Sequence, residues 1–199
     1  MNQITTYRTL KSPIQAEFKD KGSRFLAFAY PVQTAEQVKK HVDDLRQEHH
    51  KARHWCYAYR FGVDGNQFRA NDDGEPSGSA GRPILGQIDS FELTDVLVVV
   101  VRYFGGTLLG TGGLVKVYTQ AAQAVLEDAQ TEEFVERSAF ELNLSYQNYE
   151  ACRFLFEKFC ITGLRETFAE TVVLSGFVQT SLKNDFEKKI KDVCAGSLL

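Results

Sequence analysis

Two glycine-rich segments hold the residues whose types and spacing can do chemistry. The first spans residues 71–83 and the second residues 105–113. Each precedes a predicted helix, so backbone N–H groups and the positive end of a helix dipole can bind an anion there. Hydroxyl and guanidinium groups nearby can add donors. The candidate anion, phosphate or RNA contacts are Ser77, Gly78, Ser79, Arg82, Arg102, Gly105, Gly106, Thr111 and Gly112.

Neither segment contains a specific phosphate motif. No lysine follows the glycines of the second segment, so it is not a Walker A loop, and the G-x-G-x-x-G spacing of dinucleotide folds is also missing. A structural interpretation therefore stands beside the anion site. Glycines also permit positive φ angles and close packing of backbones.

Three carboxylates in the first segment form a possible accessory site. Asp72, Asp73 and Glu75 could hold Mg²⁺ through water, with Arg82 near to take a phosphate. Two other interpretations are a solvated acidic turn and an internal network of arginine–carboxylate ion pairs. The 12-residue spacing of a calcium loop is absent, and we expect no bound metal or cofactor.

The histidines and serines do not indicate a complete enzyme active site. All four histidines fall between residues 41 and 54, without the spacing of a zinc site, and they suit the C-terminal end of a helix. The order His54, Asp72 or Asp73, Ser79 is compatible with a serine triad, but a triad is defined by geometry. An enzyme is therefore the less favoured class.

Aromatic residues alternate along a predicted strand at residues 54–61. Trp55, Tyr57, Tyr59 and Phe61 share one face, which is typical of core packing or of a platform that stacks RNA bases. Arginines flank these strands and the glycine-rich segments. The arginines expected to contact RNA are Arg53, Arg60, Arg69, Arg82 and Arg102.

The bulk composition is that of an ordinary globular protein. The 199 residues are 43% hydrophobic and 25% charged, and the formal charge of −3 excludes a strong overall basic field. The N-terminal residues lack the apolar core of a signal peptide, and the apolar run Val96–Val101 is too short to span a bilayer. The four cysteines form no Cys-x-x-Cys pair and read as buried thiols. We expect a cytoplasmic protein without membrane contact.

The elements that must position these residues follow from periodicity and turn signals. Thr34 and Gln37 predict a capping box, and Val38, Val42 and Leu45 predict the buried stripe of the helix that follows. Predicted strands span residues 14–19, 23–30, 54–61, 67–70 and 95–103, and predicted helices span 34–49, 84–88 and 114–129.

A charged stretch without a strong period, residues 131–138, is interpreted as a linker between a domain at 1–130 and a domain at 139–199. The second domain has the order strand, helix, strand, strand, helix, which is most of a split βαβ arrangement. Its predicted strands are 140–145, 164–168 and 171–178, its helices are 147–160 and 181–193, and a last strand could begin at Ser197.

Two motifs carry a resemblance to a known family. Residues 72–85, DDGEPSGSAGRPIL, and residues 96–114, VLVVVVRYFGGTLLGTGGL, resemble the signature of the IMPACT/YigZ family, bacterial two-domain type. The resemblance covers almost the whole chain. It implies an α+β protein with an N-terminal domain like domain 2 of ribosomal protein S5 and a ferredoxin-like C-terminal domain similar to that of elongation factors.

The resemblance also implies a link to translation. Eukaryotic members restrain a translation-controlling kinase through an extra N-terminal domain, whereas only about a dozen residues precede the first predicted strand here. We therefore expect a translation-linked accessory factor that binds RNA, the ribosome or a translation-associated protein. The alternatives are an enzyme or ligand-binding protein acting on a phosphorylated small molecule at the glycine-rich loops, and a protein-interaction module.

Overall fold

The computed structural model describes residues 6–196, which divide into two compact units. The N-terminal unit is Tyr7–Phe134, and the C-terminal unit begins at Val135. No helix within residues 6–196 is long and apolar enough to cross a membrane. The two units are described in turn because each has its own core.

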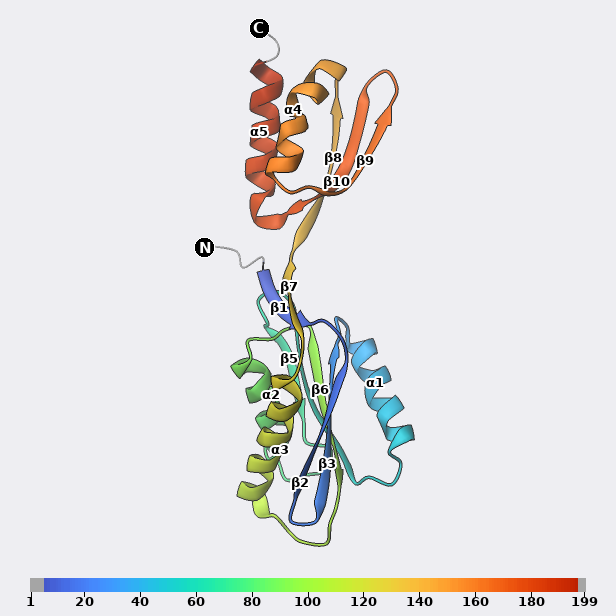
Figure 1. Ribbon diagram of the computed structural model, residues 1–199, viewed down its shortest axis with the longest axis vertical. Helices are drawn as coiled ribbons and strands as arrows, with labels where there is room; N and C mark the ends of the chain where they lie inside the picture. The colour runs from blue at the N-terminus through green and yellow to red at the C-terminus, as the bar shows by residue number, and fades with distance from the viewer. Residues whose placement is uncertain (1–5, 197–199) are drawn as a thin grey trace. The chain divides into compact units, whose positions relative to one another are not determined.

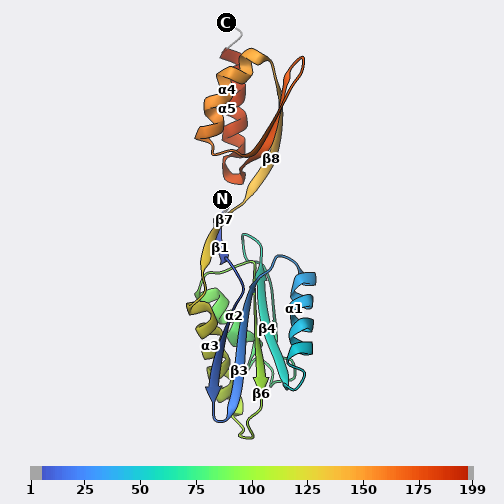
Figure 2. The same cartoon turned by 45° about the vertical axis from the view of Figure 1, so that its right-hand side comes forward.

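An antiparallel five-stranded sheet forms the N-terminal unit (Figures 1 and 2), with the strand order β2-β3-β6-β4-β5. Helix α1 covers one face, and helices α2 and α3 cover the other. The strands are β2 (Ile14–Asp20), β3 (Ser23–Pro31), β4 (His54–Phe61), β5 (Gln67–Asn71) and β6 (Val96–Tyr103), and the helices are α1 (Ala35–Glu48), α2 (Gly81–Ser90) and α3 (Gly110–Glu127).

Strand β6 lies at the centre of this sheet and is buried on both faces. Val98 and Val100 pack in the core beneath α2 and α3, whereas Val99 and Val101 pack beneath α1. The unbroken apolar run in the sequence predicts this two-sided burial. Because β6 ends at Tyr103, the sheet delivers Arg102 to the edge where the glycine-rich segments lie.

The predicted capping box at the start of α1 is confirmed. Gln37 N donates to Thr34 Oγ1 at 3.3 Å, and the Gln37 side chain accepts from the Thr34 backbone N–H. Val38, Val42 and Leu45 form the buried stripe of this helix. Local sequence is sufficient here because all the partners lie within a few turns of one another.

The stretch 131–138, interpreted as a linker, contains regular structure. It contains β7 (Thr131–Val135), which pairs with β1 (Thr6–Leu10), and the first residues of β8. Neither β1 nor β7 was predicted. The three central residues of β7 are exposed, so this two-stranded ribbon lacks the apolar alternation by which strands are recognised in a sequence.

The C-terminal unit is a three-stranded antiparallel sheet of order β8-β10-β9 with helices α4 and α5 on one face (Figure 1). Its chain order of strand, helix, strand, strand, helix is the one that the sequence predicts. The elements are β8 (Arg137–Leu144), α4 (Tyr146–Lys158), β9 (Thr162–Phe168), β10 (Val172–Gln179), a 3-10 turn (Thr180–Leu182) and α5 (Lys183–Gly196). The strand predicted from Ser197 lies outside the described residues.

One cysteine differs from the expectation of buried thiols. Cys56 and Cys152 are buried, but Cys160 is exposed. Cys160 follows the end of α4 in a turn with φ of 48°, which leads the chain out of the helix towards β9. Burial raises the pKa of the Cys152 thiol to about 12, with a further contribution from Cys194, so Cys152 stays protonated at neutral pH.

Candidate functional site

The two glycine-rich segments meet at one cavity of about 580 Å³ in the N-terminal unit, which we call the glycine-loop cavity. The first segment contributes Glu75 and Pro76, and the second contributes Leu108, Leu109, Gly110 and Thr111, with Phe104 and Leu114 on either side of it. The full lining is Arg53, His54, Glu75, Pro76, Arg102, Phe104, Leu108, Leu109, Gly110, Thr111 and Leu114.

A carboxylate of the protein already occupies the predicted anion position of the first segment. Asp72 accepts hydrogen bonds from the backbone N–H groups of Gly78 at 2.8 Å, Ala80 at 3.0 Å and Gly81 at 2.8 Å, at the start of α2. Burial alone would raise the Asp72 pKa, but these three bonds outweigh it and hold the pKa below its usual value. The first segment is therefore internally satisfied.

The other predicted donors of the first segment are also committed or lie elsewhere. Ser79 is fully buried, and its hydroxyl donates to the Pro76 carbonyl oxygen at 2.6 Å. Ser77 and Arg82 are exposed but do not line the glycine-loop cavity. Only the part of this segment near Glu75 faces the cavity.

The acidic residues form the internal network that was one of the three interpretations. Asp73 accepts from the Trp55 backbone N–H at 2.7 Å and pairs with Arg46. Glu75 Oε1 accepts from Arg102 Nη1 at 2.6 Å, and both side chains are buried. The carboxylates fix the segment from within, which leaves them poorly placed to hold a hydrated Mg²⁺.

A buried polar cluster beneath the cavity was not predicted from the sequence. Tyr118 on α3 donates its hydroxyl to Glu75 Oε1 at 2.8 Å, and the Cys56 thiol donates to the Tyr118 hydroxyl at 3.3 Å. Burial raises the pKa of both Cys56 and Tyr118, so both groups stay protonated. The only feature of the sequence that could have indicated this cluster is a single tyrosine, Tyr118, on the apolar face of an alanine-rich helix.

His54 lies at the edge of this cluster and forms no serine triad. Its Nδ1 lies 2.9 Å from the Asp73 carbonyl oxygen, which can only accept, so Nδ1 carries the proton. His54 Nε2 is 3.9 Å from Glu75 Oε1. Because Ser79 donates to Pro76 instead, the ordering His54, Asp72 or Asp73, Ser79 has no catalytic geometry.

The second segment differs from its prediction because the helix begins inside it. Helix α3 begins at Gly110, whose φ is 69°, and Thr111 and Gly112 lie in its first turn, so these residues belong to the helix start and not to the loop. The N-cap residue, Leu109, has no side-chain acceptor for the first amides, and no acidic residue stands in the first turn. This helix end opens on the cavity through Gly110 and Thr111.

Gly105 supports the structural interpretation of a glycine. A Cβ at Gly105 would lie 2.0 Å from the backbone of Gly22, in the turn between β2 and β3. Gly105 N also donates to the Ser23 hydroxyl at 3.1 Å. Gly105 is thus required for close packing, whereas Gly106, at φ of 86°, has no atom within 4 Å of such a Cβ.

A second cavity, the tyrosine groove, lies between α1 and the β4–β5 edge of the sheet. Its volume is about 590 Å³, and Tyr57 and Tyr59 line it with nearly parallel rings, 8° apart in plane and 6.5 Å between centroids. The basic residues Lys39, Arg46 and Arg69 also line it, with Asp43 as the acidic member. All four aromatic residues of this strand face contact the core beneath α1: Phe61 is part of it, and Trp55, Tyr57 and Tyr59 pack against it.

The arginines expected to contact RNA do not gather at one place. Arg60 donates to Asp89 Oδ1 at 2.9 Å, and Arg102 is buried against Glu75. Arg53 lines the glycine-loop cavity, and Arg69 lines the tyrosine groove. Alternation along β4 also sends Arg60 and Tyr59 to opposite faces of the sheet.

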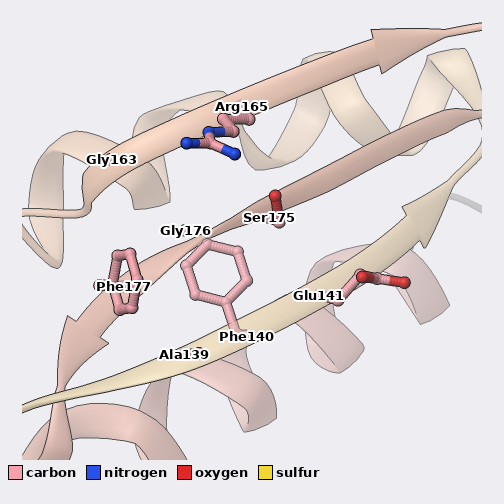
Figure 3. A pocket seen from close by; sticks show the side chains of 8 residues that line it. All are labelled: Ala139, Phe140, Glu141, Gly163, Arg165, Ser175, Gly176 and Phe177. Atoms are coloured by element: carbon pink, nitrogen blue, oxygen red, sulfur yellow. The ribbon is translucent and has the colours of Figure 1, made fainter.

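The C-terminal unit has a third hollow, of about 480 Å³, on the sheet face away from its helices (Figure 3). Glu141, Ser175 and Arg165 stand side by side across β8, β10 and β9 in register. Phe177, half exposed, lies further along β10. The sequence analysis named none of these residues.

The fold and site define a two-unit α+β protein whose larger unit carries the glycine-loop cavity, with the buried Arg102–Glu75 pair in its lining, and the tyrosine groove. The model of the Impact N-terminal domain matches residues 21–126, over half of the chain. An IMPACT family member of Haemophilus influenzae is 33% identical over 98% of this chain and 96% of its own length. YigZ of Escherichia coli is 32% identical over 94% and 93%. The chain belongs to the IMPACT family, as its two motifs indicate.

A solved structure agrees with the fold over nearly the whole chain. It is a crystal structure described as that of a hypothetical protein, 30% identical, with a TM-score of 0.71. The superposition covers 98% of this chain and 96% of that one. The mixed α/β architecture with antiparallel sheets is thus shared with a relative of similar length.

Proposed function

We propose that this protein is a translation-associated accessory factor that binds single-stranded RNA through the tyrosine groove. The link to translation comes from membership of the family and what the resemblance implied. For the domains themselves, we propose an S5 domain 2-like N-terminal unit and a ferredoxin-like C-terminal unit. The element order of the C-terminal unit supports the second assignment.

One observation carries the RNA proposal: two exposed-edge tyrosine rings lie parallel among basic side chains. Tyr57 and Tyr59 are both half-buried, and the Tyr59 ring also stacks on Phe61 with 4.5 Å between centroids, while the groove leaves room beside both tyrosines. Sequence-tolerant RNA binding combines stacking on aromatic rings with a positive channel for phosphates. Lys39, Arg46 and Arg69 against Asp43 give the groove a positive balance.

The tyrosine groove offers few free positive charges to RNA phosphates, so we expect it to bind RNA weakly. Arg46 is partly committed, since it pairs with Asp73 and its guanidinium lies 5.0 Å from the Trp55 ring centroid. Lys39 and Arg69 are exposed, and they are the residues expected to contact phosphates. A chain with a net charge of −3 can contact few phosphates, so about two to four counterions should be released on binding.

A matched pair of variants tests the stacking. Tyr57→Leu/Tyr59→Leu removes both aromatic faces but keeps apolar bulk, whereas Tyr57→Phe/Tyr59→Phe keeps the rings. We expect the leucine variant to bind a fluorescently labelled single-stranded RNA about tenfold more weakly, and the phenylalanine variant to bind within about twofold of the wild type. Equal binding by the leucine variant would refute the site.

Co-sedimentation with ribosomes tests the cellular target. At low salt the wild type should pellet with ribosomes, and moderate salt should release it. If neither ribosomes nor RNA retain it at low salt, the interpretation as a protein-interaction module replaces this proposal.

A further inference from the structure

We infer that the glycine-loop cavity binds a small nucleotide-like ligand, with its phosphate at the N-terminal end of α3 and its flat ring against Phe104 and Leu108. This inference does not rest on the RNA proposal, because the cavity and the tyrosine groove share no lining residue. The volume of about 580 Å³ is in the range of small-molecule sites.

The two helix ends near the glycine-rich segments differ in a way that points to a ligand. At α2, three amides are satisfied by Asp72. At α3, an 18-residue helix, the N-cap residue Leu109 supplies no acceptor. A long helix with open first amides favours an anion at that end.

Arg102 gives a second, independent indication that the cavity binds a ligand, because one of its buried donors has no acceptor. The residue is 5% exposed and lines the cavity, and its Nη1 is used by Glu75. Among the residues that the structure describes, Arg102 Nε is buried without a hydrogen-bond partner. A buried donor left unpaired is costly, and since Arg102 lines the cavity, a ligand acceptor that turns the guanidinium towards the cavity would satisfy it.

The charge around the cavity suits an anion despite the carboxylate in its lining. The ion pair with Arg102 offsets the charge of Glu75. Arg53, which is exposed, adds a positive charge to the same lining, and the dipole of α3 adds a partial one. The cavity is therefore positive on balance.

Gly112 does not itself line the cavity, but it follows Thr111, which does, so its backbone amide belongs to the helix end that faces the cavity. It lies in the first turn of α3, its φ is outside the left-handed region, and a Cβ there would meet no atom within 4 Å. Neither backbone conformation nor packing requires a glycine, which weakens a helix relative to alanine. Close approach of a ligand to the backbone is the remaining physical use of glycine at such a position.

The wall opposite the charged residues is apolar and unusually exposed. Leu108 is 87% exposed and Phe104 is 46% exposed. The Arg102 guanidinium lies 5.5 Å from the Phe104 ring centroid, which holds that ring beside the charged end of the cavity. A flat heterocycle can cover these two side chains while its phosphate reaches the helix end, whereas inorganic phosphate would leave them in water.

Gly86 offers a matched control for Gly112. It also lies in a helix, α2, with no atom within 4 Å of an added Cβ. Neither glycine lines the cavity itself, but Gly112 follows the lining residue Thr111 in the first turn of α3, whereas Gly86 lies in the interior of α2. Both Gly112→Ala and Gly86→Ala should raise the thermal unfolding midpoint, since alanine favours helix. Only Gly112→Ala should weaken binding.

The test is calorimetric titration of the whole protein with the four nucleoside monophosphates, adenosine and inorganic phosphate. We expect at least one monophosphate to bind more tightly than adenosine or phosphate, and Gly112→Ala to lower that affinity about tenfold. Gly86→Ala should bind within about twofold of the wild type. Arg53→Gln should weaken binding, whereas Arg82→Gln should not.

Three outcomes would overturn the inference. They are no binding by any monophosphate, equal binding by the Gly112 and Gly86 variants, and displacement of the nucleotide by short unphosphorylated RNA. The last result would assign the cavity to the RNA site. The Tyr57→Leu/Tyr59→Leu variant should keep nucleotide binding, so failure of the RNA proposal and failure of this one are distinguishable.

Discussion

The two larger sheets of the molecule, one in each unit, are buried in different ways. The five-stranded sheet is covered on both faces, with separate clusters of buried residues beneath α1 and beneath α2 and α3. The three-stranded sheet is covered on one face only, and its other face carries the polar row Glu141, Ser175 and Arg165 (Figure 3). Residues 96–101 of β6 are accordingly apolar and all buried, whereas buried residues alternate with more exposed ones along β10.

This difference in burial determines in which unit a polar group loses its hydration and lowers the free energy of unfolding when it is left unpaired. Beside the covered sheet, Glu75 and Arg102 are removed from water and depend on one another. On the C-terminal unit, a charged pair such as Glu150 and Arg153 stays solvated. Sites that need a preorganised, water-poor environment are therefore expected in the N-terminal unit.

The largest expected effect is the loss of the buried pair. Glu75→Ala leaves the Arg102 charge buried without a counterion and should cost about 3–5 kcal/mol of unfolding free energy. Glu150→Ala in the exposed pair should cost less than about 0.5 kcal/mol. Urea unfolding of the two variants measures the contrast. Similar costs for both would mean that the two units do not differ in this respect.

The next largest loss of unfolding free energy is expected from alanine substitutions on the two faces of each sheet. Val98→Ala and Val99→Ala, on opposite faces of β6, should each cost about 2 kcal/mol. On β10, Leu174→Ala should cost about 3 kcal/mol, because Leu174 is fully buried, but Val173→Ala less than about 1 kcal/mol. Thermal or chemical denaturation checks both pairs, and a small cost at Val99 would contradict two-sided burial.

A smaller effect separates the helix caps of the two units. Asp72, a charged acceptor at α2, has a lowered pKa, so its contribution is present above the unfolded-state value near 3.8 and is lost as pH falls through the lower folded value. Asp72→Asn should cost about 1–2 kcal/mol at neutral pH and progressively less in acid.

The matched cap is Ser145, which accepts from Asn148 N at 3.2 Å at the start of α4. Ser145→Ala should cost about 1 kcal/mol with no pH dependence between pH 7 and 3, because the hydroxyl does not titrate there. Denaturation at several pH values distinguishes the two caps. A pH-independent cost for Asp72→Asn would refute the ionised cap.

The smallest effect is expected from cutting the chain between its units. We propose that the domain boundary lies within residues 131–138, despite the presence of β7, and that each unit keeps its fold after cleavage there. Limited proteolysis followed by mass spectrometry should find the first cut in this stretch. First cleavage inside residues 95–130 would disprove the boundary.

Some features followed from the sequence because their partners are local or their pattern repeats. The capping box of Thr34 and Gln37, the apolar run of β6 and the two family motifs are of this kind. The ribbon of β1 and β7 was missed, since each strand is short, partly polar and paired with a partner more than a hundred residues away. The alternation of apolar and polar residues within one strand does not show which distant strand it pairs with.

The glycine-rich segments show most clearly what the sequence alone cannot predict about the site. Their residue types predicted that backbone amides and arginines were gathered near one place, and the lining of the cavity includes residues from both segments. Which amides are filled was decided only by the tertiary structure, which turns Asp72 onto the start of α2 and leaves the start of α3 open. Likewise, Arg102 meets Glu75 across 27 positions of sequence, because β6 and the first segment end at the same edge of the sheet. A donor and an acceptor satisfy one another only when folding brings them within hydrogen-bond distance, and no local pattern in the chain records that distance.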